Sequence, residues 1–131
     1  MRYLLTIYGD ESGFATATPE DVQQMMAAYG AVTEAMKEAG VMVGGEGLQP
    51  SSTATTVKVR DGETITTDGP FAETREQLGG YYLLECKDLD EAIGWAARIP
   101  GAIHGSIEVR PVMDYEASGD AGAQSQTESR V

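Results

Sequence analysis

The chain has few of the side chains that carry covalent or redox chemistry, because its 131 residues include one cysteine, one histidine and one tryptophan. A single cysteine, Cys86, excludes an intrachain disulfide and a cysteine-based zinc site. Cys86 ends the apolar run YYLLEC, residues 81–86. That setting predicts a buried and inert thiol.

Basic residues are also scarce in this chain. Nine Lys and Arg stand against 21 Asp and Glu, which gives a formal net charge of −12 and a pI near 4.3. Proteins bind phosphate backbones and anionic membrane surfaces through clustered Lys and Arg. The composition therefore argues against nucleic acid and membrane as partners.

Long apolar segments are absent as well. No run approaches the roughly 18 residues that span a bilayer. The N-terminal MRYLLTIYGDE has neither the apolar core nor the cleavage site of a signal peptide, so we expect a cytoplasmic protein. The length suits one domain, which we place at residues 1–116. Residues 117–131 are small, polar and aperiodic, and they predict a disordered acidic tail.

Apolar periodicity predicts strands that alternate with helices. The expected strands are residues 2–8, 41–50, 81–86 and 105–113, the expected helices run from Thr18 to Gly40 and from Asp88 to Pro100, and a hairpin turns at Asp61–Gly62. This order predicts an α+β fold, a ferredoxin-like βαββαβ with an extra hairpin strand and both helices on one sheet face. The methionine-rich stripe of the first helix is assigned to the core rather than to an adaptable binding groove.

The other face of the predicted sheet carries apolar side chains beside charged ones. Strand alternation assigns to it Leu4, Tyr8, Tyr82 and Leu84, next to Arg2, Glu108 and Arg110. An apolar surface with a charged rim on an open sheet indicates a partner. We therefore predict a homodimer in which two sheets pack face to face as an α+β barrel.

The stretch TTDGPFAETREQLGGYYLLE, residues 66–85, spends about ten polar residues on a connection before a strand. In one interpretation Asp68 caps an Asx turn, Phe71 fills a gap in the core and Gly79-Gly80 end the loop. In the other, Asp68 projects into a cleft as a base or a hydrogen-bond acceptor. The sequence leaves both open.

Further carboxylates follow other predicted strands. Glu46 lies in GGEGLQ, which either lets a ligand approach the backbone or forms a β-bulge, and Asp10 and Glu11 follow the first strand directly. Carboxylates brought together raise one another's pKa, which suits proton transfer. The same groups are ligands for a divalent cation, but their spacing matches no metal motif, so no metal is expected.

His104, in PGAIHGS, is the only histidine. Imidazole is the usual general acid or base near neutral pH, although a lone loop histidine is also a common surface residue. The sequence has no nucleophile elbow, P-loop or dinucleotide fingerprint, so no cofactor is expected.

Four ordered blocks, YLLTIYGDE, GVMVGGEGLQP, TDGPFAETREQLGGYYLLE and GSIEVRPVM, resemble the DGPF branch of the YCII-related family over residues 2–115. The resemblance implies a dimeric α+β barrel of ferredoxin-like protomers. Some members occur beside or fused to extracytoplasmic-function sigma factors, which implies a functional link to a sigma factor. In the wider superfamily a His–Asp pair is proposed as catalytic; no motif here matches His104 to that pair.

Two functions remain from the sequence. The first is a cofactor-independent small-molecule enzyme that uses acid–base chemistry; the second is a non-catalytic ligand-binding or regulatory module. The candidate catalytic residues are Asp68, His104 and Glu46, and the candidate ligand-binding residues are Asp10, Tyr8, Phe71 and Tyr82. An enzyme should bring its ionisable groups to one pocket, whereas a module should bury them in hydrogen bonds.

Overall fold

The structure, a computed structural model, describes residues 1–115, so the tail predicted for residues 117–131 lies outside the described residues. Its strands are Arg2–Gly9 (β1), Met42–Gly47 (β2), Thr55–Arg60 (β3), Glu63–Asp68 (β4), Gln77–Glu85 (β5) and Ser106–Pro111 (β6). Its helices are Pro19–Glu38 (α1) and Leu89–Arg98 (α2), with three 3-10 turns at Glu11–Thr16 (η1), Ser51–Thr53 (η2) and Pro100–Ala102 (η3).

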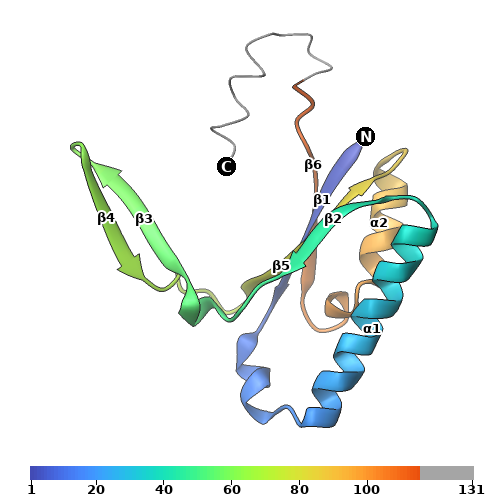
Figure 1. Ribbon diagram of the computed structural model, residues 1–131, viewed down its shortest axis with the longest axis horizontal. Coiled ribbons are helices and arrows are strands. Elements are labelled where there is room, and N and C mark those ends of the chain that lie inside the picture. Colours follow the sequence, from blue (N-terminus) through green and yellow to red (C-terminus); the bar gives the residue numbers. More distant parts are fainter. Residues whose placement is uncertain (116–131) are drawn as a thin grey trace.

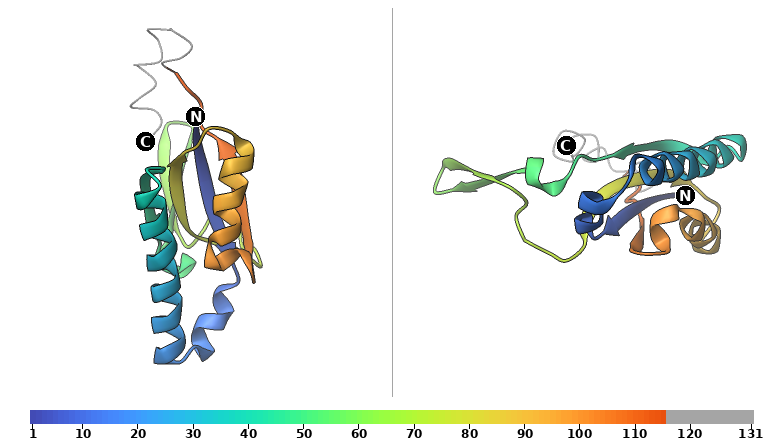
Figure 2. Two further views of the ribbon diagram at one scale, coloured as in Figure 1. Left: turned by 90° about the vertical axis from the view of Figure 1, so that its right-hand side faces the viewer. Right: turned by 90° about the horizontal axis from the view of Figure 1, so that it is seen from below.

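The main sheet is antiparallel, with the strand order β2–β5–β1–β6 (Figure 1). Both helices lie on the same face of this sheet (Figure 2). The predicted α+β class is confirmed, and the strand order is consistent with a ferredoxin-like arrangement. None of the helices in residues 1–115 is long and apolar enough to cross a membrane.

Helix α1 begins and ends where the sequence predicts. The Thr18 hydroxyl accepts a hydrogen bond from the Asp21 N–H at 3.1 Å, and the Asp21 carboxylate accepts one from the Thr18 N–H at 3.0 Å. Such an N-cap stabilises a helix by about 0.5–2 kcal/mol. Gly40, with φ of +76°, terminates the helix in a conformation that favours glycine.

The core lies between the helices and the centre of the main sheet, and it corrects one prediction. Tyr82 and Leu84 face the helices, at 7% and 0% exposure, and do not lie on the open face. The open face of β5 instead carries Tyr81 and Leu83, both half-buried. In YYLL, both sets of alternating positions carry large apolar or aromatic side chains, so the pattern alone does not show which face of β5 is buried. A shift of one residue exchanges the two faces of a strand.

The hairpin gives a second correction. The sequence predicts one extra hairpin strand in the sheet, whereas both hairpin strands form a separate two-stranded sheet. β3 and β4, residues 55–68 and here called the arm, pair with each other and project from the body (Figure 1). The Leu48 N–H still bonds the Gly79 carbonyl at 2.9 Å, but Pro50 has no N–H to extend the ladder. Positive φ values at Asp61 and Gly62 are those of the predicted type I′ turn.

Strand β5 begins at Gln77, four residues before the predicted start, so Gly79 and Gly80 lie inside the strand and do not end a loop. A Cβ at Gly80 would lie 2.8 Å from the Glu46 carbonyl oxygen of β2. Position 80 therefore requires glycine, because β2 and β5 approach closely there. In the sequence, the same glycine looks like a turn residue.

Cys86 is 2% exposed, as predicted for a buried thiol. Burial raises its pKa, and the charge of Glu91 raises it further, so the thiolate is disfavoured at neutral pH. We expect negligible reaction with a thiol reagent such as DTNB in the native protein and complete reaction in guanidinium. Rapid stoichiometric labelling of the native protein would contradict this burial.

Candidate functional site

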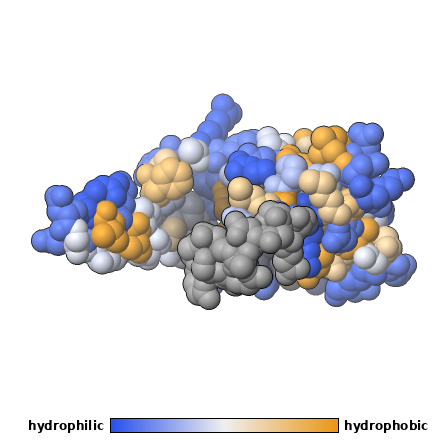
Figure 3. Space-filling model, turned by 90° about the horizontal axis from the view of Figure 1, so that it is seen from above, coloured by the Kyte–Doolittle hydropathy of each residue, from blue (hydrophilic) through white to orange (hydrophobic). Residues whose placement is uncertain are grey.

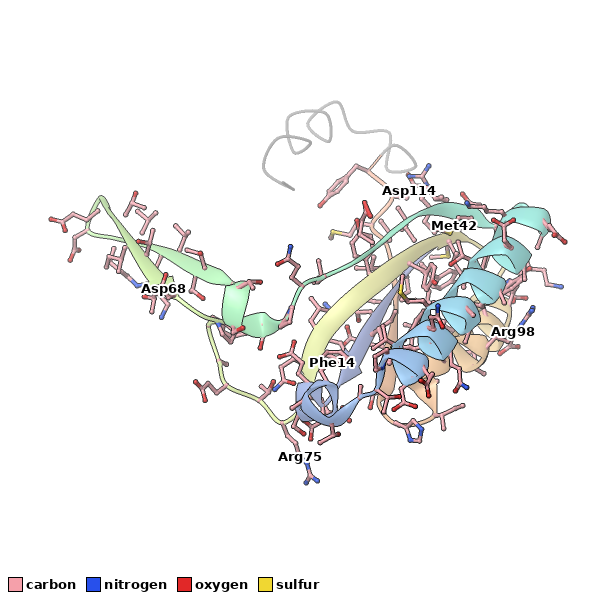
Figure 4. All side chains as sticks on the ribbon, turned by 60° about the horizontal axis from the view of Figure 1, so that its bottom comes forward. Phe14, Met42, Asp68, Arg75, Arg98 and Asp114 are labelled. Atoms are coloured by element: carbon pink, nitrogen blue, oxygen red, sulfur yellow. The ribbon has the colours of Figure 1, made fainter. Side chains whose placement is uncertain are left out.

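A pocket of about 540 Å³ lies between α1 and the main sheet, at the end where β1 stops. Its apolar lining includes Ile7, Phe14, Met25, Tyr29, Met42 and Leu48. In Figure 4, Phe14 lies on η1 near the first turns of α1, while Asp68 lies far out on the arm. The pocket is therefore built from the body alone.

The pocket exists because only the second half of α1 packs tightly on the sheet. Met36 is fully buried in the core, but Met25 is 42% exposed and lines the pocket, and Met26 is 69% exposed. The assignment of the whole methionine stripe to the core is thus correct at Met36 and wrong at Met25 and Met26. Methionine suits an irregular binding surface because its side chain is flexible and polarisable.

Three hydroxyl groups line the inner wall of the pocket. Thr33 donates to the Tyr29 carbonyl oxygen at 2.8 Å, and its oxygen lies 2.8 Å from the Tyr82 hydroxyl. Because a threonine hydroxyl has one proton, the Tyr82 hydroxyl must donate to Thr33. Burial raises the pKa of the Tyr29 phenol, so it is a neutral group at physiological pH.

The carboxylates after β1 both have structural partners. Asp10 accepts the Ser12 N–H at 2.9 Å, and hydrogen bonds from the side chain and backbone of Ser12 lower the pKa of Asp10. Glu11 accepts the Ser51 N–H at 2.8 Å and the Ser51 hydroxyl at 2.6 Å. Asp10 is therefore ionised at neutral pH, and Glu11 fastens η1, one wall of the pocket, to η2 at the base of the arm.

The loop that carries His104 is held by close backbone contact. A Cβ at Gly105 would lie 2.1 Å from the Tyr8 carbonyl oxygen, and the Gly105 N–H donates to the Gly101 carbonyl at 2.8 Å. His104 itself is exposed and lines the pocket. Glycine at position 105 thus allows this loop to pack against the end of β1.

The structure brings together four of the seven candidate residues. The pocket is lined by Asp10, Glu46, Tyr82 and His104. Tyr8 lies in a second hollow, which shares Asp10 and His104 with the pocket. Asp68 and Phe71 line neither hollow.

The DGPF segment closes the arm. Gly69, with φ of +97°, donates its N–H to the Ala54 carbonyl at 2.7 Å, and the Thr56 hydroxyl donates to the Gly69 carbonyl at 2.8 Å. Within residues 1–115 the Asp68 carboxylate has no hydrogen-bond partner, so the predicted Asx turn does not form. Phe71 is 85% exposed and fills no gap in the core.

We expect Asp68→Asn to change the free energy of unfolding by less than about 0.5 kcal/mol, because the side chain is exposed and unbonded within the described chain. A urea titration measures this change. Ligand affinity at the pocket should also be unchanged, and a loss of affinity in calorimetry would show that Asp68 reaches the site.

Several pocket residues were not predicted as site residues from the sequence, among them Phe14, Met25, Tyr29 and Thr33. Tyr29 and Met25 fit the apolar stripe of α1, and nothing in a stripe distinguishes packed positions from those facing a cavity. One sequence feature pointed to a polar site on this helix: Thr33, a polar residue, lies four positions after Tyr29. Among the described residues, no group of three or more His, Cys, Asp or Glu is arranged to hold a metal ion.

Comparison with known proteins identifies the family. Residues 1–116 match the YCII-related domain, and this match includes all of the described residues 1–115. The chain belongs to the YCII-related family. It is also 41% identical over 118 residues to an uncharacterized protein of Rhizobium meliloti (strain 1021), covering 88% of this chain and 95% of the relative.

Proposed function

We propose that this YCII-related protein is a small-molecule enzyme that uses acid–base chemistry, without an organic cofactor, in the pocket between α1 and the main sheet. One observation carries the proposal: Asp10, Glu46 and His104, which are far apart in the chain, line one pocket. Its volume, about 540 Å³, falls within the roughly 300–1,000 Å³ usual for small-molecule sites. Apolar walls with few ionisable groups are typical of such sites.

In this proposal His104 moves the proton, since imidazole both accepts and donates one near neutral pH. Glu46 is the second ionisable group at the edge of the pocket. Asp10 remains a carboxylate and stabilises positive charge that develops beside it. The neutral Tyr29 phenol is placed to contact the ligand from the α1 side.

Proton abstraction is tested by exchange in D₂O. A defined library of small metabolites is incubated with the protein, and the loss of C–H signals is followed by proton NMR. We expect enzyme-dependent exchange for at least one compound, and its loss in Gly47→Val. Gly47 lines the pocket, and a Cβ added there would meet nothing within 4 Å, so a larger side chain occupies the pocket without a backbone clash. Exchange that persists in Gly47→Val would place the chemistry elsewhere.

The second candidate, a ligand-binding or regulatory module, is favoured by one specific observation. Glu11 is used to hold Ser51 at the base of the arm, so η1 connects the pocket to a projecting element. A ligand that displaces η1 would then move the arm, which is a way to signal to a transcription partner such as a sigma factor. Compounds that bind in the pocket without exchange or turnover would support this candidate over the enzyme.

We also propose that the protein is a homodimer in which the open sheet faces pack as an α+β barrel. Leu4 and Leu83 are cross-strand neighbours on this face, and both are half-buried in the single chain. Charged pairs rim the face, with Arg110 3.0 Å from Glu108 and Arg2 3.9 Å from Glu85. Such a surface fits a second copy of itself.

The arm exposes further apolar surface, which Figure 3 shows as hydrophobic patches on the projecting sheet. Val57 and Val59 are 59% and 60% exposed. A two-stranded sheet is marginal in water unless it packs against something, so the proposed dimer also covers the arm. The segment Asp68–Phe71 that ends the arm supports assignment to the DGPF branch of the family.

At micromolar concentration, sedimentation should show a dimer that buries at least ~1,200 Å² in total. Leu83→Glu, on the open face, should convert it to a monomer. The matched control Ile93→Glu, on an exposed position of α2, should stay dimeric. A wild-type protein that sediments as a monomer would exclude the barrel.

A further inference from the structure

The charges that line the pocket all have one sign. Three carboxylates, Asp10, Glu11 and Glu46, are in the described lining, which contains no Lys or Arg. Arg75 interacts electrostatically with Asp10 but lines the neighbouring hollow, and its side chain points outward in Figure 4. The pocket is therefore a region of negative potential in a strongly acidic protein.

The usual anchors for an anionic ligand are occupied or missing in the described chain. Carboxylates and phosphates are bound by Arg, Lys or free N–H groups at a helix N-terminus. The N-terminus of α1 is closed by Thr18 and Asp21, and its first turn also carries Glu20. The N-terminus of η1 is capped by Asp10. A phosphate or carboxylate brought into this pocket would meet like charge without a compensating cation in the described lining.

The apolar lining favours the opposite charge. Phe14, Tyr29 and Tyr82 supply three aromatic rings to the lining. Aromatic faces attract ammonium groups, and more strongly where water is displaced. Gly9, Gly47 and Gly79 add wall positions where a Cβ would meet nothing or only a distant atom, 3.8 Å away at Gly79, so the wall leaves room beside the rings.

We infer that the pocket takes small molecules that combine a cationic amine with a flat apolar body, and that it selects against phosphorylated and carboxylate-bearing ligands. This inference rests on the proposed function, because it names the substrate class of the same pocket. The amine meets the carboxylates at the rim, and the apolar body lies among the aromatic rings and methionines.

Three probes with the same ring test the charge preference directly. Tryptamine, tryptophol and indole-3-acetate end in an ammonium, a hydroxyl and a carboxylate, and each is titrated into the full-length protein while amide shifts are followed by NMR. We expect tryptamine to bind best and indole-3-acetate worst, with about a tenfold or larger difference between them at low salt. Added salt should reduce this difference.

Three variants test whether the charge preference comes from the pocket lining. Asp10→Asn with Glu46→Gln should bring the three affinities together, whereas Asp68→Asn, on the arm, should leave their order unchanged. Gly47→Val should weaken all three probes. Equal affinities in the wild-type protein, tighter binding of indole-3-acetate, or no pocket shifts with any probe up to its solubility limit would each overturn the inference. The D₂O exchange experiment is independent of these probes, so failure of the ligand class is distinguishable from failure of the proposed chemistry.

Discussion

Replacement of Gly105 by alanine is expected to destabilise the protein by about 3 kcal/mol or more. The added Cβ would lie 2.1 Å from the Tyr8 carbonyl oxygen and 3.2 Å from the Gly101 carbonyl oxygen. Both obstacles are backbone atoms, so no side-chain rotation relieves the contact. β1 is paired with β5 on one side and β6 on the other, which prevents it from moving away.

The matched control is Gly94→Ala, in the interior of α2. Gly94 is exposed and a Cβ there meets nothing within 4 Å. Alanine should therefore stabilise this helix by about 0.5–1 kcal/mol, because glycine loses more backbone entropy on folding. Urea unfolding measures both variants. A Gly105→Ala protein as stable as wild type would mean that the loop of His104 does not pack against β1.

Replacement of His104 by asparagine should slow proton exchange by about 10²–10⁴-fold while ligand affinity stays nearly unchanged. An amide has hydrogen-bonding groups but takes up no proton at neutral pH. His104 is exposed, so the substitution should alter stability by no more than about 0.5 kcal/mol. The comparison of rate with affinity separates a catalytic role from a binding role.

Glu46→Gln is the parallel variant on β2, which also lines the pocket. Glu46 is exposed on β2, next to Tyr81 of β5 in the strand register. A loss of exchange in both variants would support two proton carriers. Full exchange in His104→Asn, on a compound that binds the pocket, would contradict acid–base catalysis by this histidine.

The local signals in the sequence predict local structure well. The cap at Thr18, the terminator at Gly40 and the hairpin turn at Asp61–Gly62 depend on a few neighbouring residues, and each is where the sequence places it. Asp88 likewise caps α2 by accepting the Glu91 N–H at 2.9 Å. Such features can be predicted from sequence because their stability depends on interactions among a few neighbouring residues.

The errors come from features that depend on distant parts of the chain. YYLL permits either face of β5 to be apolar, so burial of Tyr82 and Leu84 is decided by register with β1 and not by the strand itself. Gly80 looks like a turn residue, although it is required by the nearby backbone of β2. Whether the hairpin strands join the main sheet depends on where the ladder of β2 ends.

The pocket was only partly predictable for the same reason. Asp10, Glu46 and His104 attract attention as ionisable residues, but their convergence follows from the strand order. Met25 and Tyr29 were indistinguishable from core positions, because a cavity leaves no mark on helical periodicity. Conversely, the DGPF segment has a conspicuous composition but lies outside the pocket. Its Gly69, with a positive φ, bonds the Ala54 carbonyl at the base of the arm.

An amide NMR titration with tryptamine decides whether ligands bind between α1 and the main sheet, on which the proposed function depends. We expect the largest shifts at pocket residues such as Gly9, Gly47 and Gly79, and we expect Gly47→Val to remove them. Residues of the arm, such as Val57 and Thr66, should shift little. Shifts confined to the arm, or shifts that survive in Gly47→Val, would contradict binding at this pocket.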